Sequence, residues 1–320
     1  MTATENEARP QTRRRLDGDS LLKIILGIAA AFIVVLMLAL AGELINKSAL
    51  SLSKFGISFL WSRNWNPTTE IFGALPFIYG TAFTSALALL FGLPVSIGVA
   101  VFLTEKIHSA PGIGNFIGTL VELLASVPSV IYGLWALFFL SPLVRKYVET
   151  PLNHYLGFVP LFAGTPFGLD FFTAGLILAI MIIPTVSAIT RDVLNAVPNS
   201  QREALYALGA TNWEVIRKGV LPYARSGIFG ATILGLGRAV GETMAVTMVI
   251  GNEVKISASL FSGGYTLASL IANQFFEASG NLFISSIIEI GLVLFLLALV
   301  INVFARLLIW RMTKGIQFRA

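Results

Sequence analysis

The sequence predicts an all-α protein that crosses a lipid bilayer several times. Hydrophobic residues make up 56% of its 320 residues and charged residues 12%, against about 25% charged residues in a soluble domain. Six apolar stretches are each long enough to cross about 30 Å of hydrocarbon as a helix. None of them shows the alternation that marks a membrane β-strand, so helices are favoured. The six predicted transmembrane helices are residues 21–45, 77–103, 117–144, 171–190, 226–250 and 281–310.

The basic residues predict how the chain is oriented. With the N-terminus inside, most of the 22 Lys and Arg residues fall on the inner side of the membrane. The positive-inside rule then places both termini in the cytoplasm. The net charge of +5 therefore reflects topology, and we expect no nucleic-acid partner.

The rest of the chain is organised around these six helices. Residues 1–20 are expected to be a disordered cytoplasmic tail, and residues 313–320 a second cytoplasmic tail. The first helix and an outer segment fill residues 21–76, and the main transmembrane domain covers residues 77–312. The first apolar run is too long for a usual cleaved signal peptide.

Three outer segments are predicted to be rich in loops. They cover about residues 46–76, 145–170 and 251–280, where Pro and Gly residues gather. The first of them carries Trp61 and Trp65, which suit either an anchor at the membrane interface or a surface for an external partner.

The composition leaves little material for catalysis or for cofactor binding. The chain has no Cys and only 2 His, which excludes thiolate metal sites, iron–sulfur clusters and cysteine nucleophiles. The phosphate-loop pattern G-x-x-x-x-G-K-[ST] does not occur, so the chain is not expected to hydrolyse ATP. We therefore expect no cofactor, no metal and no enzymatic activity.

The predicted loop at residues 199–222 reads as two short amphipathic helices. Asn199 or Ser200 can cap the first helix, and Gly209 permits a sharp exit from it. Thr211 or Asn212 can cap the second helix, and Pro222 is expected to end it. Such a pair of helices either docks into a groove of a partner protein or lies on anionic lipid.

The spacing within this loop resembles the EAA loop of ATP-binding-cassette importer permeases. Glu203, Ala204 and Gly209 stand in register with that motif, as do Leu221 and Pro222. The sequence departs from it at Leu205, where the family usually has Ala, and at Gly219, where it usually has Ile. The resemblance implies that these five matching residues contact a separate cytoplasmic ATPase.

The resemblance extends over about residues 55–312 and points to one family. The segments 55–67, 72–85, 122–133 and 235–252 look like those of the PstC-type permease subunit of the bacterial phosphate-specific transporter. This implies a type I ABC importer permease fold in the bacterial plasma membrane. It also implies inorganic phosphate as substrate and three partners: a PstA-type permease subunit, two copies of a PstB-type ATPase and a PstS-type phosphate-binding protein.

Two charged residues fall inside the predicted fifth helix. Arg238 and Glu242 are four residues apart and therefore share one face of a helix. An isolated Arg inside a membrane costs about 2.5–3.5 kcal/mol, so Arg238 needs a partner. Either the two residues neutralise one another, or Arg238 meets an anion on the transport path while Glu242 restrains it. The resemblance supports the second interpretation, because the Arg and Glu of the matching family segment are regarded as needed for transport.

Other polar residues in the predicted helices are weaker candidates for the path. Hydroxyl groups can donate hydrogen bonds to an anion, although Ser and Thr also commonly serve helix packing in lipid. Gly237 and Gly241 form a small-xxx-small pair, which predicts close helix packing. The candidate hydroxyl groups belong to Thr84, Ser85, Ser126, Ser129 and Tyr132.

Together these features predict the permease subunit of an ATP-driven phosphate importer. Two alternatives remain open at this point. The same fold can import another oxyanion, sulfate or molybdate. A gradient-driven carrier or channel, which needs no ATPase, also fits the six apolar stretches.

Overall fold

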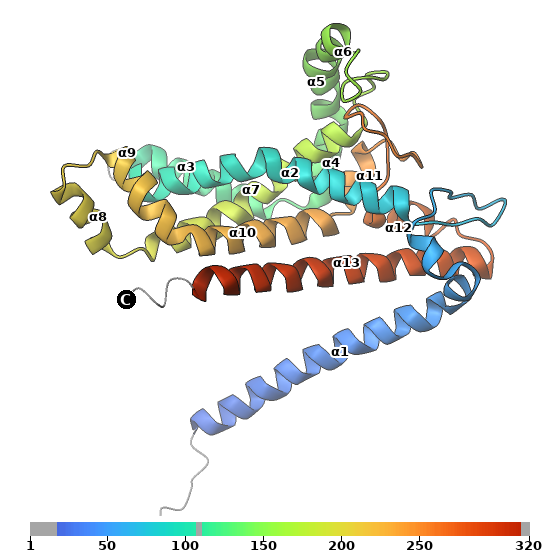
Figure 1. Ribbon diagram of the computed structural model, residues 1–320, viewed down its shortest axis with the longest axis horizontal. Coiled ribbons are helices and arrows are strands. Elements are labelled where there is room, and N and C mark those ends of the chain that lie inside the picture. The colour runs from blue at the N-terminus through green and yellow to red at the C-terminus, as the bar shows by residue number, and fades with distance from the viewer. Residues whose placement is uncertain (1–17, 107–110, 315–320) are drawn as a thin grey trace, which may run out of the picture. The chain divides into compact units, whose positions relative to one another are not determined.

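The computed structural model describes residues 18–106 and 111–314, and every regular element in that part of the chain is a helix (Figure 1). The all-α prediction is confirmed. The described chain divides into two compact units, which adjoin between Asn46 and Lys47 within α1 (Gly18–Phe55). Residues 18–20 and 313–314 are helical, unlike the predicted tails, and the rest of both tails lies outside the described residues.

Four described helices are long and apolar enough to cross a membrane. They lie in α1, α2 (Leu75–Val101), α7 (Phe171–Asn195) and α13 (Asn281–Lys314). A fifth candidate is a bent pair, residues Gly112–Ser126 and Ser129–Leu156, whose axes differ by 101°. The chain is therefore a multi-pass membrane protein, but the predicted count of six spans is not confirmed.

Two of the six predicted helices are broken. The third predicted helix divides into α3 (Pro111–Ser126) and α4 (Ser129–Trp135), with Pro128 in an extended conformation before α4. The fifth divides into α10 (Leu221–Gly241) and α11 (Met244–Val249), with Glu242 extended between them. Pro128 explains the first break because it has no N–H for the helical ladder.

Three other prolines lie in helical segments that continue past them, and a π-helical turn precedes each of the three. In a π turn the backbone bonds reach one residue further, which opens the ladder next to the proline ring. The predicted stop at Pro222 is therefore wrong, as is the predicted loop at residues 145–156. The pairs are η4 (Ala136–Leu140) with Pro142 in α5 (Ser141–Val144), η5 (Arg145–Glu149) with Pro151 in α6 (Thr150–Leu156), and η6 (Ile216–Val220) with Pro222 in α10.

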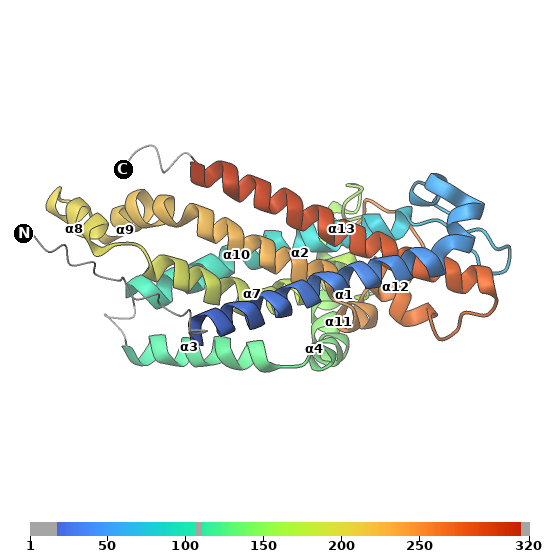
Figure 2. The ribbon, with the colours of Figure 1, turned by 90° about the horizontal axis from the view of Figure 1, so that it is seen from below.

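The core of the second unit forms where α2 and α7 pack along their lengths, with α10 against α7 (Figure 2). Gly92 allows this close approach, because a Cβ there would lie 2.9 Å from the Ala179 carbonyl oxygen. The buried side chains are almost all aliphatic or aromatic, and burial of such surface stabilises the unit by about 25 cal/mol per Å². They include Phe171, Ile177, Leu178, Met181, Ile182, Val186, Val246, Val249 and Ile250.

A second core lies next to the segment after α1. Trp65 is buried there, and its indole N–H donates to Gln274 Oε1 (2.8 Å) at the end of α12 (Leu267–Gln274). Trp61, which follows η1 (Gly56–Leu60), is 70% exposed. The two tryptophans therefore differ: Trp65 serves packing, and only Trp61 is free to meet lipid or a partner.

The two ends of the second unit carry different elements. At one end lie α8 (Asn199–Ala207), α9 (Asn212–Val215) and the C-terminal end of α13 (Figure 1). At the other end lie α5, α6, α11 and α12 with the loops between them. The 199–222 loop and the end of α13 thus share one end of this unit.

Candidate functional site

Arg238 lies near the end of α10, and its side chain is exposed. Its Nη1 donates one hydrogen bond to the Thr185 hydroxyl oxygen (3.2 Å) on α7. No ion pair involves Arg238 among the described residues. The sequence analysis did not single out Thr185, which is 53 residues away and has no local signal beyond following Pro184.

Glu242 does not pair with Arg238, although the sequence spacing predicted a shared helix face. The helix ends at Gly241, and Glu242 adopts φ −69° and ψ 129°, so the four-residue periodicity no longer applies. Its Oε1 instead accepts a hydrogen bond from the Ala245 N–H (3.3 Å) at the start of α11. The carboxylate therefore caps the next helix, and Arg238 keeps most of its donors free.

The two helix breaks come together next to Arg238. Helix α4, which begins after the first break, packs on α11, which begins after the second. Gly133 makes this contact possible, because a Cβ there would lie 2.6 Å from Met248 Sδ. The Tyr132 phenol on α4 lies within electrostatic reach of the Arg238 guanidinium. In membrane proteins, non-helical backbone at membrane depth is tolerated where protein buries it or where it lines a water-filled cavity.

Three of the predicted path residues flank the first break. Ser126, at the end of α3, is exposed, and its hydroxyl donates to the Leu123 carbonyl (2.7 Å). Ser129 starts α4 and is half-buried. The Tyr132 hydroxyl donates to the Leu124 carbonyl (2.7 Å). Of these three residues, the structure places Tyr132 within electrostatic reach of Arg238.

The other two predicted path residues are buried within α2. The Thr84 hydroxyl donates to the Gly80 carbonyl (2.8 Å) one turn earlier, and its side chain is 1% exposed. Ser85 is 2% exposed, and its hydroxyl has no protein partner among the described residues. The structure does not bring this pair to the break next to Arg238.

The small-xxx-small pair leaves an open surface beside Arg238. Gly237 and Gly241 are both exposed, and a Cβ added at either would meet no atom within 4 Å. The close packing predicted for this pair is therefore not made within the described chain. A second helix can approach this face closely.

The 199–222 loop has the two predicted helices and the predicted turn. Gly209 has φ +81°, a conformation that glycine adopts without strain. Thr211 and Glu214 form a reciprocal capping box at the start of α9. Hydrogen bonds from Lys218 and Thr211 lower the pKa of Glu214 to about 2. The predicted caps of the first helix, Asn199 and Ser200, are wrong: the N-cap position is Pro198, without a side-chain hydrogen bond.

The residues that match the EAA motif are accessible. Glu203, Ala204 and Gly209 are exposed, as is Pro222, while Leu221 is half-buried. A cavity of about 430 Å³ runs between α8 and the start of α10. Its lining includes Ala204 and Pro222 together with Gln201, Leu205, Leu208, Lys218, Gly219, Tyr223 and Arg225.

The two departures from the EAA motif compensate for each other. A Cβ at Gly219 would lie 2.4 Å from Leu205 Cδ1, so Leu205 occupies the space that a larger residue at position 219 would fill. A larger residue at one position and a smaller one at the other therefore conserve the packing volume. The loop keeps its geometry despite both substitutions.

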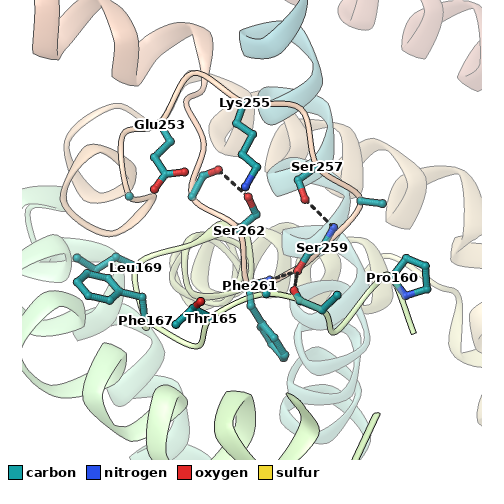
Figure 3. A pocket seen from close by; sticks show the side chains of 15 residues that line it. Pro160, Thr165, Phe167, Leu169, Glu253, Lys255, Ser257, Ser259, Phe261 and Ser262 are labelled. Carbon is teal, nitrogen blue, oxygen red and sulfur yellow. Dashed lines mark hydrogen bonds between the residues drawn. The ribbon is translucent and has the colours of Figure 1, made fainter. Parts of the chain in front are cut away.

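A further cavity lies away from Arg238, at the end of the unit that carries α5 and α6. It measures about 590 Å³ and lies between residues 160–169 and 251–263, with Lys255 pointing toward Ser262 (Figure 3). Next to the lining segment 160–169, Glu149 accepts a hydrogen bond from the Gly168 N–H (2.9 Å). Burial and the nearby Glu149 charge raise the pKa of Asp170, the N-cap of α7, to about 8.

Two membrane helices are broken, and Arg238 lies next to one of the breaks. Broken helices with a charged residue at the break are typical of transporters, so the chain has the architecture of a multi-pass helical transporter. Residues 92–314 match the family model described as the binding-protein-dependent transport system inner membrane component, and the chain belongs to this family.

Similar proteins support the same grouping. The chain is 48% identical over 289 residues to a phosphate transport system permease protein PstC of Pasteurella multocida, covering 89% of each chain. It is 45% identical over 323 residues to the PstC protein of Mesorhizobium japonicum, covering 97% of this chain and 98% of that one. It is 40% identical over 309 residues to PstC 2 of Mycobacterium tuberculosis, covering 94% and 93%.

Solved structures share the fold at lower identity. A chain of a bacterial alginate ABC transporter, in complex with an alginate-bound periplasmic protein, has a TM-score of 0.61 at 17% identity and covers 93% of this chain and 97% of that one. A chain of the MetNI methionine ABC transporter has a TM-score of 0.54 at 19% identity, covering 73% and 92%. These likenesses show a type I ABC importer permease fold.

Proposed function

We propose that this chain is the transmembrane permease subunit of an ATP-driven importer of inorganic phosphate. One observation carries the proposal: relatives that are 40–48% identical over about nine-tenths of the chain are phosphate transport permeases. The position of Arg238 supports it, because a guanidinium with free donors suits the oxygens of a phosphate anion.

The proposed topology has six spans and both termini in the cytoplasm of a bacterium, with the chain in the plasma membrane. The fifth of these spans is α10 continued by α11, and the break at Glu242 divides it. The excess of basic residues on one side supports this orientation. The shared location of the 199–222 loop and the end of α13 at one end of the second unit also fits it.

Arg238 is the proposed charge on the anion's path. Its positive charge offsets the cost of moving a charged anion through a medium of low dielectric constant. Glu242 holds the start of α11 in place, and Ser129 can donate a hydrogen bond to the anion. Ser126 and Tyr132 can do so once they exchange their bonds to the Leu123 and Leu124 carbonyls for the anion. We also place Thr84 and Ser85 on the path, in a state of the transporter in which α2 has moved.

The proposed partners follow from the same assignment. The open face at Gly237 and Gly241 is where a PstA-type subunit completes the pathway, so that this chain forms half of it. Glu203, Ala204, Gly209, Leu221 and Pro222 form the contact with one of two copies of a PstB-type ATPase, where ATP is hydrolysed. A PstS-type protein delivers phosphate at the opposite side.

Two measurements distinguish this function from a gradient-driven carrier or channel. We expect an ATPase to co-purify with this chain, and the association to be lost on substitution of Glu203 or Gly209. Transport in liposomes by this polypeptide alone would contradict the proposal. An importer of sulfate or molybdate remains a second candidate, because Arg238 suits any oxyanion.

A further inference from the structure

Arg202 on α8 has a partner for every N–H group of its guanidinium. Nε and Nη2 both donate to Glu105 Oε1, at 3.3 and 2.8 Å. Nη2 also donates to the Leu194 carbonyl (3.0 Å), and Nη1 donates to the Val197 carbonyl (2.6 Å) and to Asn199 Oδ1 (3.4 Å). A guanidinium has five N–H donors, and all five are used here.

Two of these partners, Glu105 and Leu194, come from the ends of two other helices. Glu105 lies in η2 (Phe102–Lys106), the π turn that ends α2. Leu194 lies in the last turn of α7, whose final carbonyls have no partner within the helix. A cation near a helix C-terminus is also favoured by the helix dipole. Arg202 therefore ties α8 to the ends of α2 and α7 at once.

The ion pair is sheltered from water, which sets it apart from the other ion pair of the loop. The side chains of Arg202 and Glu105 are only 17% and 12% exposed. Lys218 and Glu214 are 65% and 40% exposed, and their ion pair stays within one continuous helical segment. Exposed ion pairs contribute little to stability, whereas charge-assisted hydrogen bonds that are sheltered from water are strong. Of these two pairs in the loop, the Arg202 pair is the one that joins separate elements.

Besides the Arg202 bonds, helix α8 is held by Leu205, which is partly buried and packs against a small core. None of its residues is fully buried. The small core just beyond it joins the ends of α2 and α7 to α9 and α10 through Ala100, Leu194, Val197, Val215, Val220 and Ala224. Helices α2 and α7 in turn pack along their lengths. A displacement of α8 can therefore reach both helices through Arg202.

We propose that Arg202, with Glu105, is the positioning residue that transmits movement of α8 to α2 and α7. This inference rests on the proposed function, in which α8 contacts the ATPase. It assigns to Arg202 a role that is separate from ATPase docking: the docking residues capture the ATPase, and Arg202 passes the movement on.

The test compares variants of this chain in the complete complex in liposomes, with phosphate uptake and ATP hydrolysis measured together. We expect Arg202→Gln to lower phosphate taken up per ATP hydrolysed about tenfold or more, within the range of coupling between sites. ATPase capture should stay unchanged. Arg306→Gln, at an exposed position on α13, is the matched control and should keep the ratio of the unsubstituted chain.

Two further variants protect the test against a folding defect. The exchanged pair Glu105→Arg with Arg202→Glu should recover part of the phosphate uptake per ATP hydrolysed. Arg202→Lys keeps the positive charge but lacks the planar guanidinium, so its uptake per ATP should lie between those of Arg202→Gln and the unsubstituted chain. The chain has no Cys, so spin labels at Leu90→Cys and Ser200→Cys report on α2 and α8 specifically. We expect Arg202→Gln to broaden the distance distribution between these labels.

The outcomes separate the two proposals. A normal ratio in Arg202→Gln, or a loss of ATPase capture by every Arg202 variant, overturns the role of Arg202 while the proposed function stands. No ATP-dependent uptake by the unsubstituted complex overturns the proposed function, and the role of Arg202 falls with it.

Discussion

The 199–222 loop and the break after Gly241 each hold one arginine, and the two arginines are bonded very differently. Arg202 uses all five of its donors on protein acceptors and is largely buried. Arg238 uses one donor, on Thr185, and is exposed. Both residues carry one positive charge, so charge alone does not distinguish them. They differ in the number of guanidinium N–H donors that remain free. Arg202 has all its donors bonded to the protein, whereas Arg238 remains available to a ligand or partner.

The largest expected effect tests the available arginine. Arg238→Ala should lower ATP-driven phosphate uptake by about 100-fold or more, because it removes the positive partner of the phosphate anion on the proposed path. Loss of one partner of a desolvated charge pair costs about 3–5 kcal/mol. Complex assembly should stay intact. Initial uptake rates in liposomes measure the effect, with Thr185→Val as the control that removes one hydrogen bond and lowers uptake by about tenfold at most. Normal uptake by Arg238→Ala would reduce this residue to a structural role.

The next effect tests how tightly the 199–222 loop, which holds Arg202, is packed at Gly219 and Leu205. Gly219→Ile should destabilise the chain by about 1–3 kcal/mol, because the new side chain meets Leu205. Adding Leu205→Ala should recover most of that loss, since the pair then conserves volume. Thermal unfolding of the purified complex measures both. Strictly additive effects of the two substitutions would show that they do not touch.

A smaller effect tests the turn of the same loop. Gly209→Ala has free space for its Cβ but is strained by φ +81°, at a cost of about 1 kcal/mol. We expect weaker ATPase capture in pull-down measurements. Gly98→Ala is the matched control, because it has equal space and lies within α2. Equal capture by both variants would remove any need for this turn.

The smallest effect concerns pH. The pKa of Glu214 is lowered from 4.5 to about 2 in the folded loop. The contribution of Glu214 to the stability of the loop is therefore fully present above pH 4.5 and is lost as the pH falls toward 2. Hydrogen exchange of the Glu214 amide should therefore show the same protection factor at pH 8 and at pH 6. A marked change in protection over that range, absent in Glu214→Gln, would contradict the assignment.

Local signals in the sequence predicted the loop well. Gly209 and Thr211 act within one or two turns of the chain, and the structure gives both the predicted roles. The error at Asn199 arose because Pro198 occupies the cap position, and the error at Pro222 because a π turn precedes it. A proline alone does not indicate a π turn, because Pro94 lies inside α2 without one.

The site around Arg238 was less predictable because it depends on distant contacts. Regular helical spacing predicted that Arg238 and Glu242 share one helix face, but the helix ends at Gly241 and Glu242 accepts a hydrogen bond from the Ala245 N–H of α11 instead. The bonds of Arg238 to Thr185 and of Arg202 to Glu105 span 53 and 97 residues. Such pairs depend on how α2, α7 and α10 pack, which hydrophobic patterns alone do not specify.

The most direct test of the central claim is uptake of labelled phosphate by the reconstituted complex, with and without ATP. Unlabelled phosphate, sulfate and molybdate serve as competitors. The account predicts uptake that requires ATP and that only unlabelled phosphate suppresses efficiently. Uptake without ATP, or stronger suppression by sulfate or molybdate than by phosphate, would contradict it.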